Sequence, residues 1–176
     1  KAKEAGRSVH EANALSLRAL LLRAKGDQAG ALAMIQQAIA IAEAAGMYRS
    51  LGEMQALLAS SIAAAGDLKT AREVAARAAD STQKSGDAWA VPERLLRVAD
   101  LMARTGDTAG ALDTFERGEA YVDLLTGRAL TIQQRSALLS AASELYARHF
   151  DFVATTLKRP DLAFAVIEQV RGRLNT

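Results

Sequence analysis

The sequence predicts an all-α fold, in which antiparallel helix hairpins stack into an α-α superhelix, and three observations carry that prediction. The dipeptide Gly-Asp recurs every 40 residues, at Gly26-Asp27, Gly66-Asp67 and Gly106-Asp107. Half of the residues are hydrophobic but only 5% are aromatic, and alanine dominates, which favours closely approaching helices over a sheet. The two prolines and nearly all of the 12 glycines fall at predicted helix ends, where helix breakers belong.

A period of this length is typical of repeat arrays, in which each unit buries its apolar side against its neighbours. We expect one array over 1–176. It comprises the tail of a preceding repeat at 1–7, repeats at 8–46, 47–86 and 87–127, and a longer final repeat at 128–176. Because the chain begins within a unit and ends on an uncovered apolar helix face, we expect it to be a fragment of a larger protein.

The first two hairpins follow one design. Each is expected to open on a capping box, Ser8-x-x-Glu11 and Ser50-x-x-Glu53, in which a hydroxyl and a carboxylate satisfy free backbone N–H groups. Gly-Asp then ends the first helix and caps the second, because glycine adopts the left-handed conformation and aspartate accepts from the next turn. The core of the second hairpin is lighter, since Ala75 occupies the place of Ile35 and Phe115, so this hairpin should pack closer or depend more on its neighbours.

The third hairpin has Pro92 in the first turn of its first helix, where the missing N–H costs nothing. After Gly127 the 40-residue period is no longer kept. Thr131-x-x-Gln134 is a further capping box, and the apolar pattern predicts one long helix over 132–157. Residues 158–161 then form a turn, and a last amphipathic helix runs toward Arg173.

Composition excludes several classes of function. The 22 basic and 20 acidic residues give a net charge of +2 and interleave along the helices, so neither a nucleic-acid partner nor a membrane partner is expected. The absence of cysteine removes disulfides, thiolate metal sites and cysteine nucleophiles from this chain. No apolar run approaches the length of a membrane helix. A cytoplasmic location is favoured, although the natural N-terminus is absent.

The units resemble tetratricopeptide (TPR) repeats, which alternate large and small residues at fixed places in two helices. Those places read Leu15, Arg18, Ala19, Leu22, Ala31 and Ile35; then Gln55, Leu58, Ala59, Ile62, Ala71 and Ala75; then Leu95, Val98, Ala99, Met102, Ala111 and Phe115. The period departs from the family's usual 34 residues, and the usual proline after the second helix is missing. The resemblance implies a right-handed solenoid of such hairpins that binds proteins.

A second resemblance covers the last part of the chain. The run from Tyr146 through Arg159, Pro160, Ala163, Phe164, Glu168, Arg171 and Arg173 is similar to the final repeat that precedes the caspase-like domain of bacterial CHAT-type proteins. The resemblance implies a regulatory or sensing array that acts on a downstream domain of the same polypeptide. It does not make this chain a peptidase.

In such arrays, residues of the first helix of each hairpin that point away from the seam face the bound partner. In this sequence they are Asn13, Ser16, Leu20 and Arg23; Glu53, Ala56 and Ser60; and Glu93, Leu96, Arg97, Asp100 and Arg104. In the third hairpin the charges alternate at helical spacing, which predicts a ladder of ion pairs. The ladder is either a solvated helix face or the floor of a groove that recognises a protein or peptide. The Lys and Asn combination that grips carboxylates in family members is missing.

No residue pattern predicts a catalytic centre, a cofactor or a metal site. His10 and His149 lie in different helices without a carboxylate or cysteine at ligand spacing, so solvated or packing roles are expected. The sequence therefore predicts a non-catalytic protein-interaction scaffold, with the groove of a CHAT-type regulatory array as the preferred reading. The alternative is the effector- or peptide-binding superhelix of a bacterial transcription regulator.

Overall fold

The computed structural model describes residues 2–128 and 131–174, and within these ranges it contains helices and short turns but no strand. The predicted all-α fold class is thereby confirmed. The chain divides into two compact units, unit 1 (Lys1–Asp87) and unit 2 (Ala88–Thr176), which are described separately. Among the described helices, none combines the length and the apolar character that a membrane span requires.

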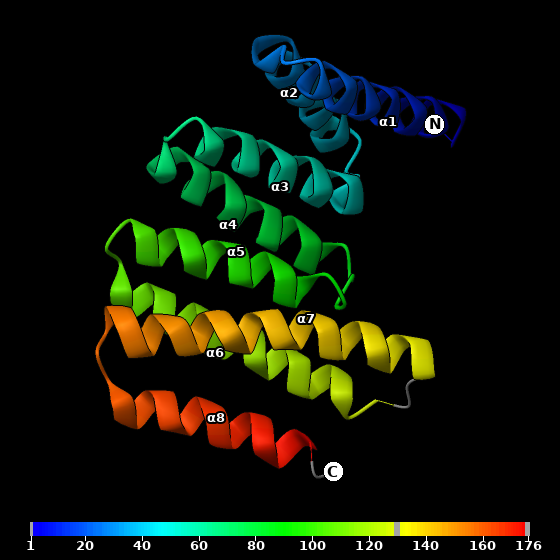
Figure 1. The fold of residues 1–176 in the computed structure, drawn as a ribbon. Helices are drawn as coiled ribbons and strands as arrows, with labels where there is room; N and C mark the ends of the chain where they lie inside the picture. Colours follow the sequence, from blue (N-terminus) through cyan, green and yellow to red (C-terminus); the bar gives the residue numbers. More distant parts are fainter. Residues whose placement is uncertain (1, 129–130, 175–176) are drawn as a thin grey trace. The chain divides into compact units, whose positions relative to one another are not determined.

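Unit 1 consists of four helices that pack in chain order, as the blue to green part of Figure 1 shows. They are α1 (Ala2–Ala24), α2 (Gln28–Ala44), α3 (Tyr48–Ala64) and α4 (Leu68–Lys84). The core where α1, α2 and α3 meet is built mainly from alanine and a few larger residues, namely Ala12, Ala38, Ala42, Leu51 and Met54. Small core residues let helix backbones approach closely, as the alanine-rich composition predicts.

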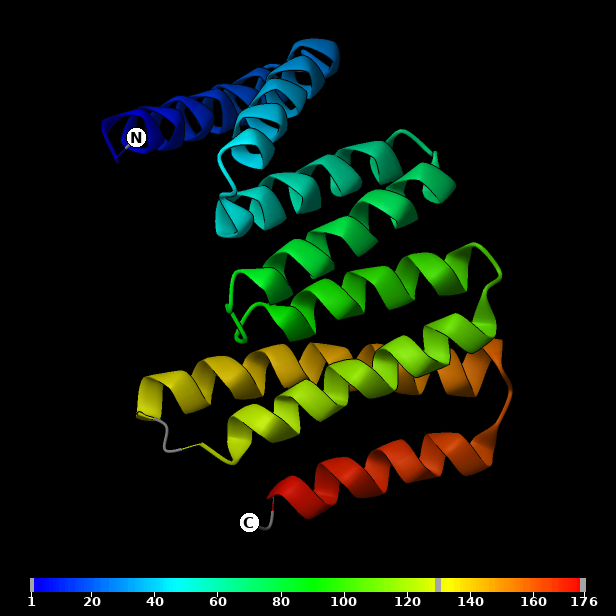
Figure 2. The same ribbon diagram turned by 180° about the vertical axis from the view of Figure 1, so that it is seen from behind.

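Unit 2 consists of α5 (Val91–Arg104), α6 (Thr108–Thr126), α7 (Ile132–Asp151), the π-helical turn η1 (Phe152–Thr156) and α8 (Pro160–Leu174). Helix α7 lies alongside α6 in both views (Figures 1 and 2) and also contacts α5. Its core includes Phe115, Leu125, Leu145 and Val153. Helix α8 packs on α7 and η1 and contributes Ala163 and Val166 to this core.

The turns between helices have the residues and backbone conformations that the 40-residue period predicts. Glycines in the left-handed conformation follow the first five helices, at Gly26, Gly46, Gly66, Gly86 and Gly106, with φ between 66° and 95°. The aspartates after the first, third and fifth of these glycines accept a backbone N–H of the next helix, at Asp27, Asp67 and Asp107. At Asp67 the hydrogen bonds from Thr70 lower the pKa of the carboxyl group. The predicted Gly-Asp turns are confirmed.

Two of the three predicted capping boxes are wrong. Helix α1 runs through Ser8 without interruption, and α3 begins at Tyr48, so Ser50 lies inside its first turn instead of before it. The chain reverses at Gly46, and its left-handed backbone positions the helix start before the Ser-x-x-Glu pattern. The third box is confirmed, because Thr131 and Gln134 exchange both hydrogen bonds.

Helices α3 and α4 approach closely at Gly52. A Cβ atom on Gly52 would lie 2.6 Å from Thr82 Oγ1 and 3.3 Å from the carbonyl oxygen of Ala78, so only glycine fits. One turn along α3, Gln55 Oε1 accepts a buried hydrogen bond of 2.8 Å from the Ser81 hydroxyl of α4. This contact agrees with the closer packing expected for the hairpin with the lighter core.

The long helix predicted over 132–157 is present with one difference, since its last turn is π-helical. The N–H of Leu157 donates to the carbonyl of Phe152, and the N–H of Arg159 donates to that of Val153. Lys158, with φ of 54°, reverses the chain, and α8 begins at Pro160, where the missing N–H has no intrahelical partner. The predicted turn at this point is therefore confirmed.

Candidate functional site

The predicted groove positions of unit 1 lie partly around one cavity. Arg23 of α1 and Ser60 of α3 line an open cavity of about 870 Å³ together with residues of α2. The hydroxyl of Ser60 donates to the carbonyl of Ala56, and that of Ser16 donates to the carbonyl of Ala12. Asn13 and Glu53 are exposed and do not line this cavity. The structure therefore brings Arg23 and Ser60 together.

The predicted charge ladder of α5 in unit 2 forms only in part. Asp100 contacts Arg104 at 4.0 Å as predicted, but Glu93 pairs with its neighbour Arg94 at 3.2 Å. Asp100 also pairs with Arg148 of α7, so it joins two helices instead of belonging to one helix face. The reason is that α7 packs beside α5 and presents a cation that the local spacing could not reveal.

Two other predicted positions of α5 differ from each other in exposure. Arg97 is exposed, as a groove residue should be, whereas Leu96 is only 3% exposed and belongs to the core of unit 2. Leu96 is therefore a packing residue, and its prediction as a groove residue was wrong. Asp100 and Arg104 line a small cavity of about 250 Å³ with Arg148, Asp151 and Thr156, where both charge signs are present.

The most unusual feature of unit 2 is a buried pair of titratable groups. Nδ1 of His149, in the last turn of α7, lies 2.7 Å from Oε1 of Glu119 in α6, and each residue is 3% exposed. The helices approach closely here, since a Cβ atom on the neighbouring Gly118 would lie 3.1 Å from the Leu145 side chain. Burial of both groups strengthens their interaction, because little water competes for it.

The imidazole of His149 is held from two sides. Its ring stacks on Phe115 with centroids 5.0 Å apart and planes 4° apart, while Phe115 also contacts Phe152. When Nδ1 carries the proton, it donates to the Glu119 carboxylate, and Nε2 is left as an acceptor. Nε2 is buried and has no hydrogen-bond partner among the described residues. A buried polar atom without a partner is rare and calls for an explanation.

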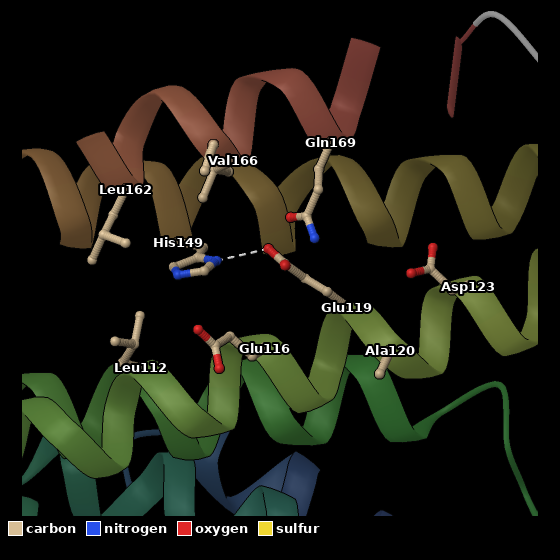
Figure 3. Close-up of a pocket in the computed structure, with 10 residues that line it drawn as sticks. Leu112, Glu116, Glu119, Ala120, Asp123, His149, Leu162, Val166 and Gln169 are labelled. Atoms are coloured by element: carbon tan, nitrogen blue, oxygen red, sulfur yellow. Dashed lines mark hydrogen bonds and ion pairs between the residues drawn. The ribbon is translucent and has the colours of Figure 1, made fainter. Parts of the chain in front are cut away.

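An open cavity lies beside this pair, between α6 and α8 (Figure 3). It has a volume of about 410 Å³, and its walls combine two kinds of side chain. The polar residues are Glu116, Glu119, Asp123, His149 and Gln169, and the apolar ones are Leu112, Ala120, Leu162, Ala165 and Val166. We call this cavity the acidic pocket, because three of its lining residues carry carboxylates and none is a lysine or an arginine.

Figure 3 shows how the side chains of the acidic pocket are arranged. Glu119 reaches from α6 to the imidazole of His149, while Gln169 points down from α8 toward the same space. The second ring nitrogen of His149 faces the end of the pocket where Leu112, Leu162 and Glu116 lie. The pocket therefore combines carboxylates, an amide and an unpartnered ring nitrogen with apolar walls.

The groups that line the acidic pocket limit the chemistry that it offers. Glu119 and His149 are arranged as an acid and the base it orients, but no serine, threonine or tyrosine hydroxyl lies among the lining residues to serve as a nucleophile. In the part of the chain that the structure describes, no three histidines, aspartates or glutamates are grouped as metal ligands. The pocket can instead accept hydrogen bonds and balance a positive charge.

Sequence spacing could not reveal this site. The sequence predicts a solvated or packing role for His149, and the packing role is confirmed, because the ring is buried against Phe115. No carboxylate lies at ligand spacing in the sequence, whereas Glu119 contacts His149 from another helix, 30 residues upstream. The pair could have been inferred only from the position of Glu119, which shares the buried face of its helix with Phe115 and Val122.

Comparison with known proteins gives the fold. No family model matches the sequence, and no curated protein matches it. The chain is similar to the crystal structure of BtubC (BKLC) from P. vanneervenii, with 18% identity and a TM-score of 0.58 over 92% of this chain. It spans 65% of the length of that BtubC chain.

The chain is also similar to a putative kinesin light chain with nearly identical TPR-like repeats from Podosopora anserina. The identity is 15% and the TM-score 0.52, over 91% of this chain and 93% of that one. A variant of the same protein gives 15% identity and a TM-score of 0.53, over 91% and 92% of the two chains. At these identities the likeness shows the fold alone, and that fold is all-α and TPR-like.

Proposed function

We propose that this chain is a non-catalytic scaffold that binds a partner protein or peptide. The observation that carries the proposal is the acidic pocket, an open cavity of about 410 Å³ whose apolar and acidic walls come from α6, α7 and α8. Ligand sites of proteins have this character, with apolar walls and a few placed polar groups. The TPR-like fold supports the same function, because stacked helix hairpins present long helix faces to a partner.

The exposed positions predicted on α1, α3 and α5 remain candidates for a second contact with the partner. In unit 1 they include Arg23 and Ser60, which share a cavity, and in unit 2 they include Arg97 and Arg104. Arginine is enriched where proteins contact one another, because its planar group forms several directed hydrogen bonds. We include these positions in the proposed binding surface.

We further propose that the array regulates a caspase-like domain of the same polypeptide. It rests on the residue pattern from Tyr146 to Arg173, which includes the end of α7, the turn η1 and most of α8. Deletion of 1–176 from the full-length protein should change the response of the neighbouring domain to its stimulus. An unchanged response would contradict this regulatory role. The alternative role in a transcription regulator has no supporting feature among the described residues.

The experiment that tests the scaffold function compares capture of partners by matched variants. Tagged wild-type protein, the double variant Arg97→Ala/Arg104→Ala and the control Arg77→Ala/Arg117→Ala are expressed in the source cells, and retained proteins are quantified by mass spectrometry. The control removes the same charge from exposed sites on α4 and α6. We expect at least one protein to be retained by the wild type and the control but less by the Arg97→Ala/Arg104→Ala variant. Equal retention by all three proteins would show that Arg97 and Arg104 are solvated and do not contact the partner.

A further inference from the structure

We infer that the acidic pocket takes the cationic end of a lysine or arginine side chain that belongs to the partner protein. This inference rests on the proposed scaffold function and names the chemistry of the group that the pocket recognises. Three features of the pocket carry it, namely its charge, the unpartnered nitrogen of His149 and its apolar walls.

The charge of the pocket selects cations. Glu116 and Glu119 lie on one face of α6 at helical spacing and line the pocket together, and none of the lining residues is a lysine or an arginine. The amide of Gln169 on α8 adds an acceptor oxygen from the opposite wall. Two carboxylates that line the same cavity attract a cation more strongly than a single carboxylate does. An ammonium or guanidinium group is therefore the favoured occupant.

The unpartnered nitrogen of His149 points to a hydrogen-bond donor. In the tautomer whose Nδ1–H donates to Glu119, Nε2 is an acceptor, and this nitrogen is buried and has no partner among the described residues. Lysine and arginine carry only donors at their ends, so either would satisfy this atom. In Figure 3 that nitrogen points toward the end of the pocket where Leu112 and Leu162 lie, and both leucines are half-buried. Because the nitrogen is buried, a side chain that covers it must move when a donor binds.

The apolar walls and the size of the pocket fit an organic cation. Leu112, Leu162 and Val166 provide a surface on which an aliphatic stem can lie while its charged end stays among the carboxylates. A bare metal ion fits less well, because within the described residues no three histidine, aspartate or glutamate side chains converge as ligands. The combination of an apolar stem and a charged tip describes a lysine or arginine side chain.

The test follows the imidazole of His149 directly. The chain has two histidines, and His10 is exposed on α1, so a His10→Gln variant assigns both sets of ring signals in a long-range ¹H–¹⁵N spectrum. The protein is titrated with N-acetyl-arginine amide, N-acetyl-lysine amide and the neutral isostere N-acetyl-citrulline amide. We expect the two cations to shift the Nε2 signal of His149 saturably and the neutral compound to have at most a weak effect.

Matched variants separate the pocket from general surface charge. Glu116→Gln removes one exposed carboxylate of the pocket, and we expect it to weaken cation binding by about threefold. Asp113→Asn removes one exposed carboxylate from the same helix outside the pocket, where it pairs with Arg117, and should leave binding unchanged. Equal effects of the two variants would show that only the overall charge matters, which would overturn the inference.

The remaining outcomes also decide the question. Equal shifts with the citrulline and arginine compounds would show an apolar pocket without charge selection, and no shift with any compound would show that the pocket is closed to such groups. Agmatine is a small molecule with a free amine. If it binds about tenfold or more tightly than N-acetyl-arginine amide, the pocket takes a small amine instead of a side chain of a partner protein. Each of these results overturns the inference. None decides the scaffold function, which is tested separately by partner capture with the arginine variants.

Discussion

His149 of α7 and Glu119 of α6 form a hydrogen bond of 2.7 Å in the interior of unit 2, where each residue is 3% exposed. Replacement of Glu119 by leucine removes the partner of Nδ1 and leaves a buried imidazole with no hydrogen bond. We expect this change to lower the free energy of unfolding by about 3 kcal/mol, as for other buried pairs that lose one partner. Denaturation by urea, followed by circular dichroism, measures the change.

The matched variant Glu119→Gln keeps an acceptor oxygen in the same place. It should cost less than about 1.5 kcal/mol, since a neutral hydrogen bond replaces a charge-assisted one. A Gln variant as unstable as the Leu variant would show that the hydrogen bond is not what stabilises this part of unit 2.

Gly52 is the residue that permits the close approach of α3 and α4. In Gly52→Ala the new methyl group would lie 2.6 Å from Thr82 Oγ1 and 3.2 Å from the Thr82 backbone nitrogen, so the two helices must separate. We expect a loss of about 2 kcal/mol in the free energy of unfolding, although alanine favours a helix over glycine.

Gly172→Ala is the control for this prediction. Gly172 lies in α8, and a Cβ atom there would meet nothing within 4 Å, so its replacement should not destabilise the protein. Thermal unfolding of the two variants side by side gives the comparison. A Gly52→Ala variant as stable as Gly172→Ala would contradict the close helix contact.

Asp161 gives a prediction of pH dependence. Arg159 donates to both of its carboxylate oxygens, at 2.8 and 2.6 Å, and thereby lowers the pKa of Asp161 from 3.8 to about 2. Since the pKa in the folded state is lower than in the unfolded state, the stabilisation by this pair is present above about pH 4. It is lost as the pH falls toward 2.

A carboxyl ¹³C titration by NMR measures the midpoint of Asp161 directly. In Arg159→Gln the midpoint should return toward 3.8, whereas Arg171→Gln, which removes a cation that pairs with Glu168 on the same helix, should leave it near 2. An unshifted midpoint in Arg159→Gln would show that another group is responsible.

Much of the fold follows from local sequence. The Gly-Asp period located three helix turns, because a left-handed glycine followed by a capping aspartate ends one helix and begins another within a few residues. The Ser-x-x-Glu pattern failed at Ser8 and Ser50, since the same residues also occur inside helices. Thr131-x-x-Gln134 succeeded because Thr131 lies directly before α7 in an extended conformation, so that its hydroxyl accepts from the N–H of Gln134.

The candidate site could not be predicted in the same way. Its central contact joins Glu119 and His149 across 30 residues, and its opposite wall comes from α8. The ladder on α5 failed for the same reason, because Asp100 pairs with Arg148 of α7 as well as with Arg104. Helical spacing predicts contacts within one helix, whereas these contacts depend on how helices pack against one another.

Site-specific photo-cross-linking tests the central claim, that this chain binds a partner protein, most directly. The photoreactive residue p-benzoylphenylalanine replaces Ala165, an exposed residue that lines the acidic pocket, or Ala109, an exposed residue of α6 outside it. After irradiation of the source cells, we expect a cross-linked protein from position 165 and much less of it from position 109. Absence of any cross-link from 165, or equal cross-linking from both positions, would contradict the claim.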